Sequence, residues 1–469
     1  MMGYKEIYRR YRQQILDGRL KPGERVPAIR VLASELQVAR KTVEAAYEIL
    51  TGEGYFVSQG AKGTHVNPDL QLPSVASVAT SELILAPSPP SSESKGELRL
   101  GIPALDAFPH KKWLLLAGKI ARSLRPEEMV VPPVMGYQPL REAIANYLNI
   151  SRGLNCKPGQ IFITNGYRAN LQLILSVLAQ PNDKVVFEDP GYFLGQRLLK
   201  HIAPSLHYVP VDQQGMDIDY LQRNHADARF AIVTPTHQSP LAVSLSLPRK
   251  HQLLEWAQQN NSWVIEDDYD GEFHYTRKVT PALKSLDIHE RVIYTGTFSK
   301  TIMPAMRIGY LVMPLATVGR FSELGQILET GLPLLPQKIL AQFINEGHFY
   351  RHLKKMRILY QQRRRMMLDA IQFMFPDLFE FELTGGGMHI VAFLKCDRQD
   401  TALAELWRKH ELCVLPLSGW YAQQPKRYGL VIGYTNIQSV EQAQAILQRV
   451  AEKTRCLFSD PGGMGIPTQ

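Results

Sequence analysis

The sequence has 469 residues, of which 45% are hydrophobic and 21% charged, and its formal net charge is +9 at pH 7. This length predicts roughly two to four domains, and the composition is typical of a globular protein with sizeable cores. The absence of any run of about 18 apolar residues argues against a membrane span, and the first residues lack the apolar core of a secretory signal. The four scattered cysteines form no CxxC pair, which argues against a disulfide framework or a zinc site. We therefore expect a cytoplasmic protein.

Residues 1–66 predict three helices followed by a short hairpin. Apolar residues recur at helical spacing in the first stretch, at Ile7, Tyr11, Ile15 and Leu16. After turn chemistry in GRLKPGERVP, the segment IRVLASEL predicts a second helix and RKTVEAAYEILTGEG a third. Two short strands around the glycine-rich segment SQGAKG complete the pattern of a winged helix-turn-helix domain.

The charge of this first domain suits a nucleic acid partner. A helix-turn-helix places the first residues of its second helix in the major groove of DNA, and these are Arg40, Lys41 and Thr42. Arg30 on the preceding helix and Lys62 on the wing are placed to contact phosphate or a groove edge. Residues 1–66 contain 11 Lys and Arg against 7 Asp and Glu, so we predict binding to double-stranded operator DNA.

The rest of the chain reads as a linker, a large domain and a tail. Residues 67–96 predict a linker because they are rich in serine and hold five prolines: Pro68, Pro73, Pro87, Pro89 and Pro90. From 97 to 458 helical stretches alternate with apolar strands, expected at 160–164, 184–189, 229–235, 262–270, 291–296 and 307–314. This alternation predicts an α/β fold with a doubly wound, mostly parallel sheet between helices. Residues 459–469, rich in Gly and Pro, predict a flexible tail.

Several residues of the large domain form the pattern of a pyridoxal 5′-phosphate site. Lys300 lies on a polar turn after the strand RVIY, where it can form a Schiff base. Asp267 and Tyr269 share one face of a strand, so Asp267 is expected to face the pyridine nitrogen and Tyr269 the phenolic oxygen. Tyr192, at the exit of another strand, suits stacking on the ring.

Two further groups of residues suit the phosphate of this cofactor. The segment ITNGYRANLQLIL predicts a strand, a turn and the start of a helix, whose backbone amides can bind phosphate at Gly166, Tyr167 and Arg168. The remaining phosphate donors are expected to be three side chains: Thr297, Ser299 and Arg307. Each of these residues alone has an ordinary structural alternative, such as a helix cap or a surface ion pair, but their order along one fold favours the cofactor site.

These motifs resemble known families. The segment from ILDGRLKPGERVP to AKGTHV resembles the DNA-binding domain of the GntR superfamily of winged-helix repressors over nearly its whole length. Residues 97–455 resemble the fold-type-I aminotransferases, which depend on pyridoxal phosphate. The combination resembles the MocR/GabR regulators over nearly the whole chain. That resemblance implies a head-to-tail homodimer, with each DNA-binding domain carried over the other subunit.

The resemblance also implies roles for individual residues. It implies DNA contacts at Arg30, Arg40, Lys41, Thr42 and the wing glycines Gly60 and Gly63, whereas Ala39 stands where a serine usually contacts phosphate. In the large domain it implies Lys300 as the Schiff-base lysine, Asp267 at the pyridine nitrogen, Tyr269 at the phenolic oxygen and Tyr192 on the ring. The loop TPTHQSP corresponds to a cofactor-lining loop, which makes His237 a further candidate.

Three positions depart from the pattern of a working aminotransferase. Val431 stands where family members carry an arginine that grips a substrate carboxylate, and Arg427 lies four residues away along the strand. Val131 stands where a tyrosine often reaches the neighbouring subunit's phosphate, and Leu194 replaces a second carboxylate-binding arginine. Losing a bidentate arginine removes both affinity and orientation for a carboxylate.

These departures leave three interpretations open. The first is a transcriptional regulator whose aminotransferase-like domain senses a small molecule, either pyridoxal phosphate itself or an amine or amino acid. The second is a working aminotransferase with an accessory DNA-binding domain, against which Val431 and Val131 argue because turnover needs a positioned substrate. The third is a DNA-binding protein with a dead pocket, against which the complete cofactor pattern argues.

Overall fold

The structure is a computed structural model that describes residues 2–70, 96–275, 281–328, 330–382, 384–423 and 425–459. The chain divides into two compact units, Met1–Ser91 and Ser92–Gln469, and each is described by itself. Most of the predicted linker 67–96 and nearly all of the predicted tail 459–469 lie outside the described residues.

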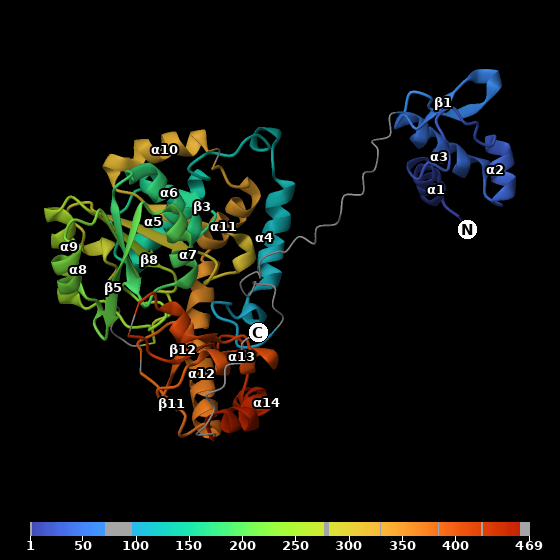
Figure 1. Cartoon of the computed structure of the whole chain (residues 1–469). Coiled ribbons are helices and arrows are strands. Elements are labelled where there is room, and N and C mark those ends of the chain that lie inside the picture. The colour runs from blue at the N-terminus through green and yellow to red at the C-terminus, as the bar shows by residue number, and fades with distance from the viewer. Residues whose placement is uncertain are drawn as a thin grey trace. The chain divides into compact units, whose positions relative to one another are not determined.

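The first unit is a three-helix bundle with a hairpin (Figure 1). Its elements are α1 (Tyr4–Leu16), α2 (Ile29–Glu35), α3 (Arg40–Gly52), β1 (Phe56–Ser58) and β2 (Thr64–Val66). The helices form where the sequence predicts them because Ile7 and Ile15 of α1 and Val43 and Leu50 of α3 are buried on facing stripes. The strands pair antiparallel, with Phe56 opposite Val66.

The wing between β1 and β2 depends on glycine. Gly60 and Gly63 have φ angles of +59° and +93°, a region that residues with a Cβ rarely adopt. A Cβ on Gly63 would also lie 3.2 Å from the side chain of Arg25. The two glycines expected at the wing are therefore required by its backbone.

The second unit is built on an eight-stranded sheet with the order β3-β10-β9-β8-β7-β4-β5-β6. These strands are β3 (Ile161–Thr164), β4 (Lys184–Asp189), β5 (Ser205–Asp212), β6 (Gly215–Met216), β7 (Phe230–Val233), β8 (Trp263–Asp268), β9 (Val292–Thr297) and β10 (Gly309–Val312). The five strands from β9 to β5 in the sheet are parallel, whereas β10 runs antiparallel to both β3 and β9. The mostly parallel sheet expected from the sequence is therefore confirmed, with strand ends shifted by at most two residues.

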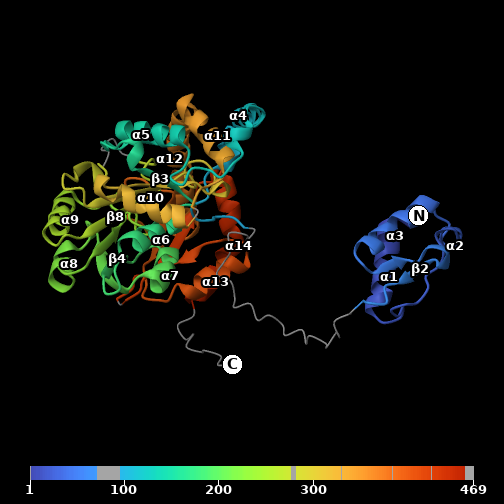
Figure 2. The same cartoon turned by 90° about the horizontal axis from the view of Figure 1, so that it is seen from above.

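Helices cover both faces of this sheet because successive residues of the central strands are apolar on both sides. In β8, for example, Val264 packs on one face and Ile265 on the other. The helices before and around the sheet are α4 (His110–Arg122), α5 (Gln138–Ser151), α6 (Tyr167–Leu178), α7 (Phe193–Ile202), α8 (Ile218–Asn224), α9 (Leu247–Gln259), α10 (Val318–Ile327) and α11 (Leu334–Asn345). Figures 1 and 2 show α8 and α9 on one side of the sheet and α6 and α7 on the other.

A second, antiparallel sheet of four short strands has the order β11-β12-β14-β13. It consists of β11 (Phe379–Glu380), β12 (His389–Leu394), β13 (Leu415–Pro416) and β14 (Gly429–Gly433), and it packs with α13 (Thr401–Lys409) and α14 (Val440–Ser459). The 27-residue helix α12 (His348–Met374) runs between the two sheets (Figure 1). Within the part of the chain that the structure describes, no helix is long and apolar enough to cross a membrane.

A buried ion pair fixes the end of β8. Arg152, just after α5, donates from Nη2 to Asp268 Oδ2 at 2.6 Å, and both side chains are almost fully buried. The same Nη2 atom reaches Thr236 Oγ1 at 2.8 Å, and Asp268 also accepts from the hydroxyl of Tyr294 at 2.6 Å. The backbone of Asp267, which lies next to Asp268, is held in place by these contacts.

We expect Arg152→Met to destabilise the second unit by about 3–5 kcal/mol, because it leaves Asp268 buried without its cation. The change is measurable by urea unfolding followed by tryptophan fluorescence, since all five tryptophans lie beyond residue 112 and report on the second unit alone. The matched control is Lys409→Ala, which removes the exposed pair with Glu405 and is expected to cost less than about 1 kcal/mol. Equal unfolding midpoints for the two variants would contradict this assignment.

Candidate functional sites

Lys300 lies in the turn that follows β9, at the edge of the sheet where the parallel strands end. Its partly buried side chain donates from Nζ to the carbonyl oxygen of Gly101 at 3.1 Å. A Cβ at Gly101 would lie 2.1 Å from this Nζ, so the lysine end would have to shift, and the φ of +66° at Gly101 itself favours glycine. Burial lowers the pKa of the Lys300 amine, and the charges of Asp270 and Asp267 oppose this shift.

Asp267 is the penultimate residue of β8 and is 5% exposed. Burial raises the pKa of its carboxyl well above the ordinary value, and the neighbouring charges of Asp268 and Asp270 raise it further. A carboxyl in this setting is stabilised in its charged form by a cation that faces it. The protonated ring nitrogen of pyridoxal phosphate is such a cation, so Asp267 fits the role expected from the sequence.

Orphaned polar atoms surround Lys300 and Asp267. The hydroxyl of Tyr269 and Oδ2 of Asp270 are buried without a hydrogen-bond partner among the described residues. Buried polar atoms in folded proteins nearly always have a partner, so such a cluster indicates a place for a polar ligand. The ring of Tyr192, at the start of α7, lies near those of Tyr167 and Trp420, with centroids 6.0 and 6.2 Å apart. The unpartnered polar atoms of Tyr269 and Asp270 therefore fit the presence of a polar cofactor beside Lys300 and Asp267.

The expected phosphate residues gather at the N-terminus of α6. Gly166 directly precedes this helix and has a φ of +91°. Gly309 lies so close to Gly166 that a Cβ on Gly309 would be 2.7 Å from the Cα of Gly166. Arg307 donates from Nη2 to the carbonyl oxygen of Asn165 at 2.8 Å, which places its guanidinium beside the helix start. Arg168, in the first turn of α6, is exposed, so two cations and the free amides of a helix end meet here.

Thr297 and Ser299 lie on the neighbouring strand end. The backbone amide of Ser299 donates to Thr297 Oγ1 at 3.1 Å, and Thr297 pairs with Gly309 across the β9–β10 ladder. The ladder continues to Thr164, two residues before Gly166. The sheet thus brings both predicted groups of phosphate donors to one edge.

His237 is buried in the loop after β7, but its contact is with another side chain. Its Nδ1 lies 2.9 Å from Asp270 Oδ1, and a Cβ at Gly386 would lie 2.5 Å from its Nε2. Asp270 and Gly101 are thus site residues that the sequence analysis missed. The repeated acids of EDDYDGE are a signal for Asp270, whereas Gly101 has none because its role depends on a lysine 199 positions away.

The structure shows what surrounds the three positions that depart from the aminotransferase pattern, which are Val431, Val131 and Leu194. Val431 is fully buried in β14. Arg427 donates from Nη2 to Glu382 Oε1 at 2.6 Å and lies 3.6 Å from the centre of the Phe393 ring. Val131 is 84% exposed, and Leu194 is partly buried in the first turn of α7.

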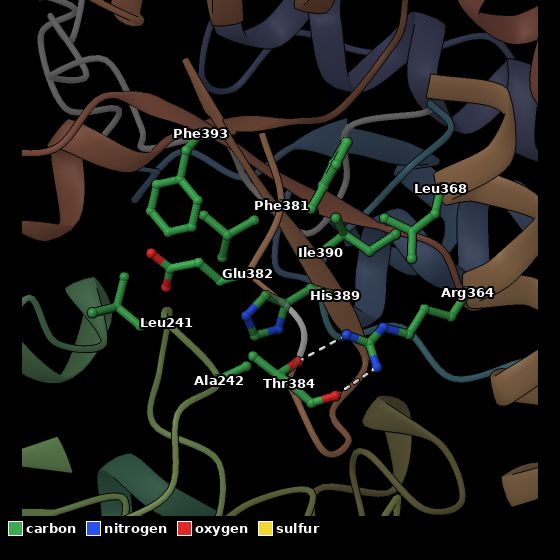
Figure 3. Close-up of a pocket in the computed structure, with 11 residues that line it drawn as sticks. Leu241, Ala242, Arg364, Leu368, Phe381, Glu382, Thr384, His389, Ile390 and Phe393 are labelled. Carbon is green, nitrogen blue, oxygen red and sulfur yellow. Dashed lines mark hydrogen bonds between the residues drawn. The ribbon is translucent and has the colours of Figure 1, made fainter. Parts of the chain in front are cut away.

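A small pocket lies beside the second sheet, between α12, β12 and the loop around residue 242 (Figure 3). Arg364 extends from α12 across it and donates from both Nη atoms to Thr384, at 2.8 Å to the carbonyl oxygen and 2.9 Å to the hydroxyl. His389 lies in the wall, with its Nε2 at 2.6 Å from the carbonyl oxygen of Pro240. None of the predicted cofactor residues lines this pocket.

In the first unit, the predicted DNA-contact residues form an exposed surface. Arg40, Lys41 and Thr42 are the first three residues of α3, and both cations are exposed. Arg30 in the first turn of α2 and Lys62 on the wing are also exposed. Ala39 is the N-cap of α3 and provides no side-chain cap, so the backbone amides there are left to other acceptors.

Two family models match the chain. Residues 3–66 match the bacterial regulatory proteins of the gntR family, and residues 101–429 match aminotransferase class I and II. The chain is 25% identical to the Pyrococcus horikoshii kynurenine aminotransferase in its crystal structure, with a TM-score of 0.70 over 78% of this chain and 92% of that one. The fold-type-I expectation is confirmed, and an aminotransferase domain of this class indicates pyridoxal 5′-phosphate as the cofactor.

Two relatives match nearly the whole chain. The probable rhizopine catabolism regulatory protein MocR of Rhizobium meliloti is 32% identical over 92% of this chain and 90% of its own. The HTH-type pyridoxine biosynthesis transcriptional regulator PdxR of Corynebacterium glutamicum is 31% identical over 92% of this chain and 91% of its own. The chain therefore belongs to the family of HTH-type transcriptional regulators that join a gntR-family DNA-binding domain to an aminotransferase class I and II domain.

Proposed function

We propose that this regulator uses its aminotransferase-like unit as a sensor, and that catalysis is not its main role. One contrast carries the proposal. The surroundings of Lys300 suit the cofactor, whereas Val431, where a carboxylate-binding arginine is expected, lies in an apolar cluster. A transaminase needs both a cofactor and a positioned substrate, while a sensor needs only a ligand that binds one arrangement better than another.

In this proposal each residue around the cofactor has one task. Pyridoxal phosphate, when bound, supplies a carbonyl that reacts with amines and a ring that withdraws electrons. Lys300 attaches the cofactor, Asp267 keeps the ring nitrogen protonated, and the free hydroxyl of Tyr269 donates to the phenolic oxygen. Tyr192 covers the ring. The phosphate is held by the start of α6 and by four side chains: Arg168, Thr297, Ser299 and Arg307.

The DNA-binding unit is proposed to read its operator with the start of α3. Arg40 and Lys41 are exposed at this helix end, and Thr42 lies beside them. Arg30 and the wing, with Lys62 between the two positive-φ glycines, add contacts to phosphate or to a groove edge. Ligand binding at Lys300 would then shift an equilibrium between two arrangements that bind DNA with different affinity.

We also propose that the chain acts as a head-to-tail homodimer. The second unit exposes large apolar side chains on three stretches: Leu114 and Leu115 of α4, Met129, Val130 and Val131, and Ile327 and Leu328 at the end of α10. The last two stretches are neighbours, because Gly331 and Gly325 pack against Pro132 and Val134. Exposed apolar side chains gathered on one part of a surface are typical of an interface.

The small molecule that is sensed is proposed to be pyridoxal phosphate itself or an amine or amino acid. The name of the PdxR relative supports the first choice. The rival function is a working aminotransferase with an accessory DNA-binding domain. It predicts steady-state turnover of amino acids with keto acids. We expect no such turnover, at most a single half-reaction per site.

Lys300→Ala is expected to abolish the visible absorption band that the purified protein shows with bound pyridoxal phosphate. The reason is that no other group in the proposed site offers an amine to the cofactor. The control is Lys184→Ala, which removes an exposed lysine paired with Asp227 and should leave the band unchanged. A band that persists in Lys300→Ala would assign the cofactor to another lysine.

Arg40→Ala is expected to weaken binding to DNA by about 1–3 kcal/mol if Arg40 reads a base. Binding is measured by fluorescence anisotropy on fragments that the wild-type protein selects from a random pool. Arg9, an exposed arginine in the middle of α1, provides the control, and Arg9→Ala should change the affinity little. Equal losses for both variants would indicate a general charge effect without base reading.

Leu115→Asp is expected to shift the protein toward monomer at micromolar concentration, because it places a charge in the proposed interface. Sedimentation velocity measures the shift. The control is Phe373→Asp in α12, where the native side chain is 72% exposed against 74% for Leu115. A wild-type protein that sediments as a monomer would overturn the dimer.

A further inference from the structure

We propose that the small molecule which enters the cofactor-loaded site is an amine without a carboxylate, with a cationic head and an apolar body. This inference rests on the proposed function, because it takes Lys300 as the residue that holds the cofactor. It narrows the ligand class from amines and amino acids to amines alone. Three features of the described residues carry it.

The first feature is an apolar wall next to the lysine. Val431 packs in a buried cluster whose other members are Leu241, Val243, Val391, Phe393, Leu417 and Trp420. Tyr192, proposed to cover the cofactor ring, and Leu100 pack against this cluster. Leu100 directly precedes Gly101, whose carbonyl oxygen accepts from Lys300. The wall therefore adjoins both the ring position and the amine.

The second feature is that three arginines on or beside α12 and the second sheet are engaged elsewhere. Arg427 is paired with Glu382 at 2.6 Å and lies over the ring of Phe393. Arg364 uses both Nη atoms on Thr384, as Figure 3 shows. Arg363 binds Asp106 at 2.6 Å and the carbonyl oxygen of Thr435. A ligand carboxylate at the wall that used one of these three arginines would have to displace the partner that the arginine already has.

The third feature is a buried carboxylate, Asp270, whose charge acts on the Lys300 amine and which keeps one oxygen without a partner among the described residues. Asp270 is 1% exposed, its Oδ1 contacts His237 at 2.9 Å, and its Oδ2 has no partner among the described residues. The charges of Asp270 and Asp267 both favour the protonated form of the Lys300 amine. An alkylammonium ion presents the same head group as lysine, and because Asp267 is assigned to the ring nitrogen, the carboxylate left to accommodate this ion is that of Asp270.

An amino acid meets a different environment. Its carboxylate is attached to the carbon that carries the amine, so it would be buried between the apolar wall and Asp270. A buried charge without a partner costs several kcal/mol, and a like charge nearby adds to this cost. We therefore expect an amine to bind at least about 100-fold more tightly than the amino acid that differs from it only by the carboxylate.

The test uses the full-length, pyridoxal phosphate-loaded protein and matched pairs of ligands. The pairs are 2-phenylethylamine against L- and D-phenylalanine, and butylamine against L- and D-norvaline. Binding is followed by the change in the cofactor's absorption band and, independently, by the heat of titration. The expected result is half-saturation at a concentration at least about 100-fold lower for each amine.

Two variants probe the two sides of the site. Val431→Arg is expected to strengthen amino acid binding at least about 10-fold, whereas Val431→Met, which keeps the wall apolar, retains the preference for amines. Because an arginine in a fully buried cluster can prevent folding, Asp270→Asn is the second probe. It removes the carboxylate charge and should weaken amine binding about 10-fold.

The outcomes separate this inference from the proposed function. Amino acids that bind as tightly as their amines, or a protein with the cofactor band that binds neither, overturn the inference and leave the cofactor role of Lys300 intact. Unchanged amine binding in Asp270→Asn also overturns it. A protein that shows no band after addition of pyridoxal phosphate overturns the proposed function, and this inference with it.

Discussion

The second unit depends on the burial of five acidic side chains within seven residues, from Glu266 to Glu272, and on the partner that each one finds. Glu266 accepts from the backbone amides of Leu283 and Lys284, at 2.8 and 2.7 Å. Asp268 is paired with Arg152, and Glu272 accepts from the hydroxyl of Tyr147 at 3.0 Å. Asp267 and Asp270 alone face the candidate site. The fold thus gives Glu266, Asp268 and Glu272 partners from within, although Oδ1 of Asp268 has none among the described residues, and it leaves Asp267 and one oxygen of Asp270 for a ligand.

For Glu266, Asp267 and Asp268 this division follows from the geometry of a strand, whereas Asp270 and Glu272 lie beyond the end of β8. Successive side chains of β8 point to opposite faces, so Glu266 and Asp268 lie on one side and Asp267 on the other. Burial raises the pKa of Glu266 to about 7 and raises that of Asp267 well above its ordinary value. Keeping these neighbouring carboxyls buried and ionised therefore costs free energy when no cation faces them. A ring cation at Asp267 and an ammonium group at Asp270 would each relieve part of that cost.

The sequence predicted the elements with strong local signals and missed the contacts that depend on packing. The strand KVVFED has the bounds that the structure gives to β4, and the apolar stripes of α1 and α3 are buried as expected. Strand β5 and the short strands β11 and β13 were missed, because their side chains lack a continuous apolar run, and β12 was missed although HIVAFL is such a run. Lys300 and Asp267 were identified through motifs, whereas Gly101 and Arg152 act on residues more than 100 positions away. No local pattern reveals such a contact.

Helix α12 is a single long helix of 27 residues that extends from the acidic segment to the second sheet. Its 27 residues span about 40 Å as a straight helix, so a tilt of about 5° at one end moves the other end by about 3.5 Å. The helix is bound along its length: Arg357 donates to the backbone of Glu272, at the end of the acidic segment, and Arg364 to Thr384 near the second sheet. A tilt of this size would therefore move the far end of α12 without any loss of secondary structure. Because α12 is one unbroken helix of 27 residues, its length would set how far one end moves for a given tilt of the other.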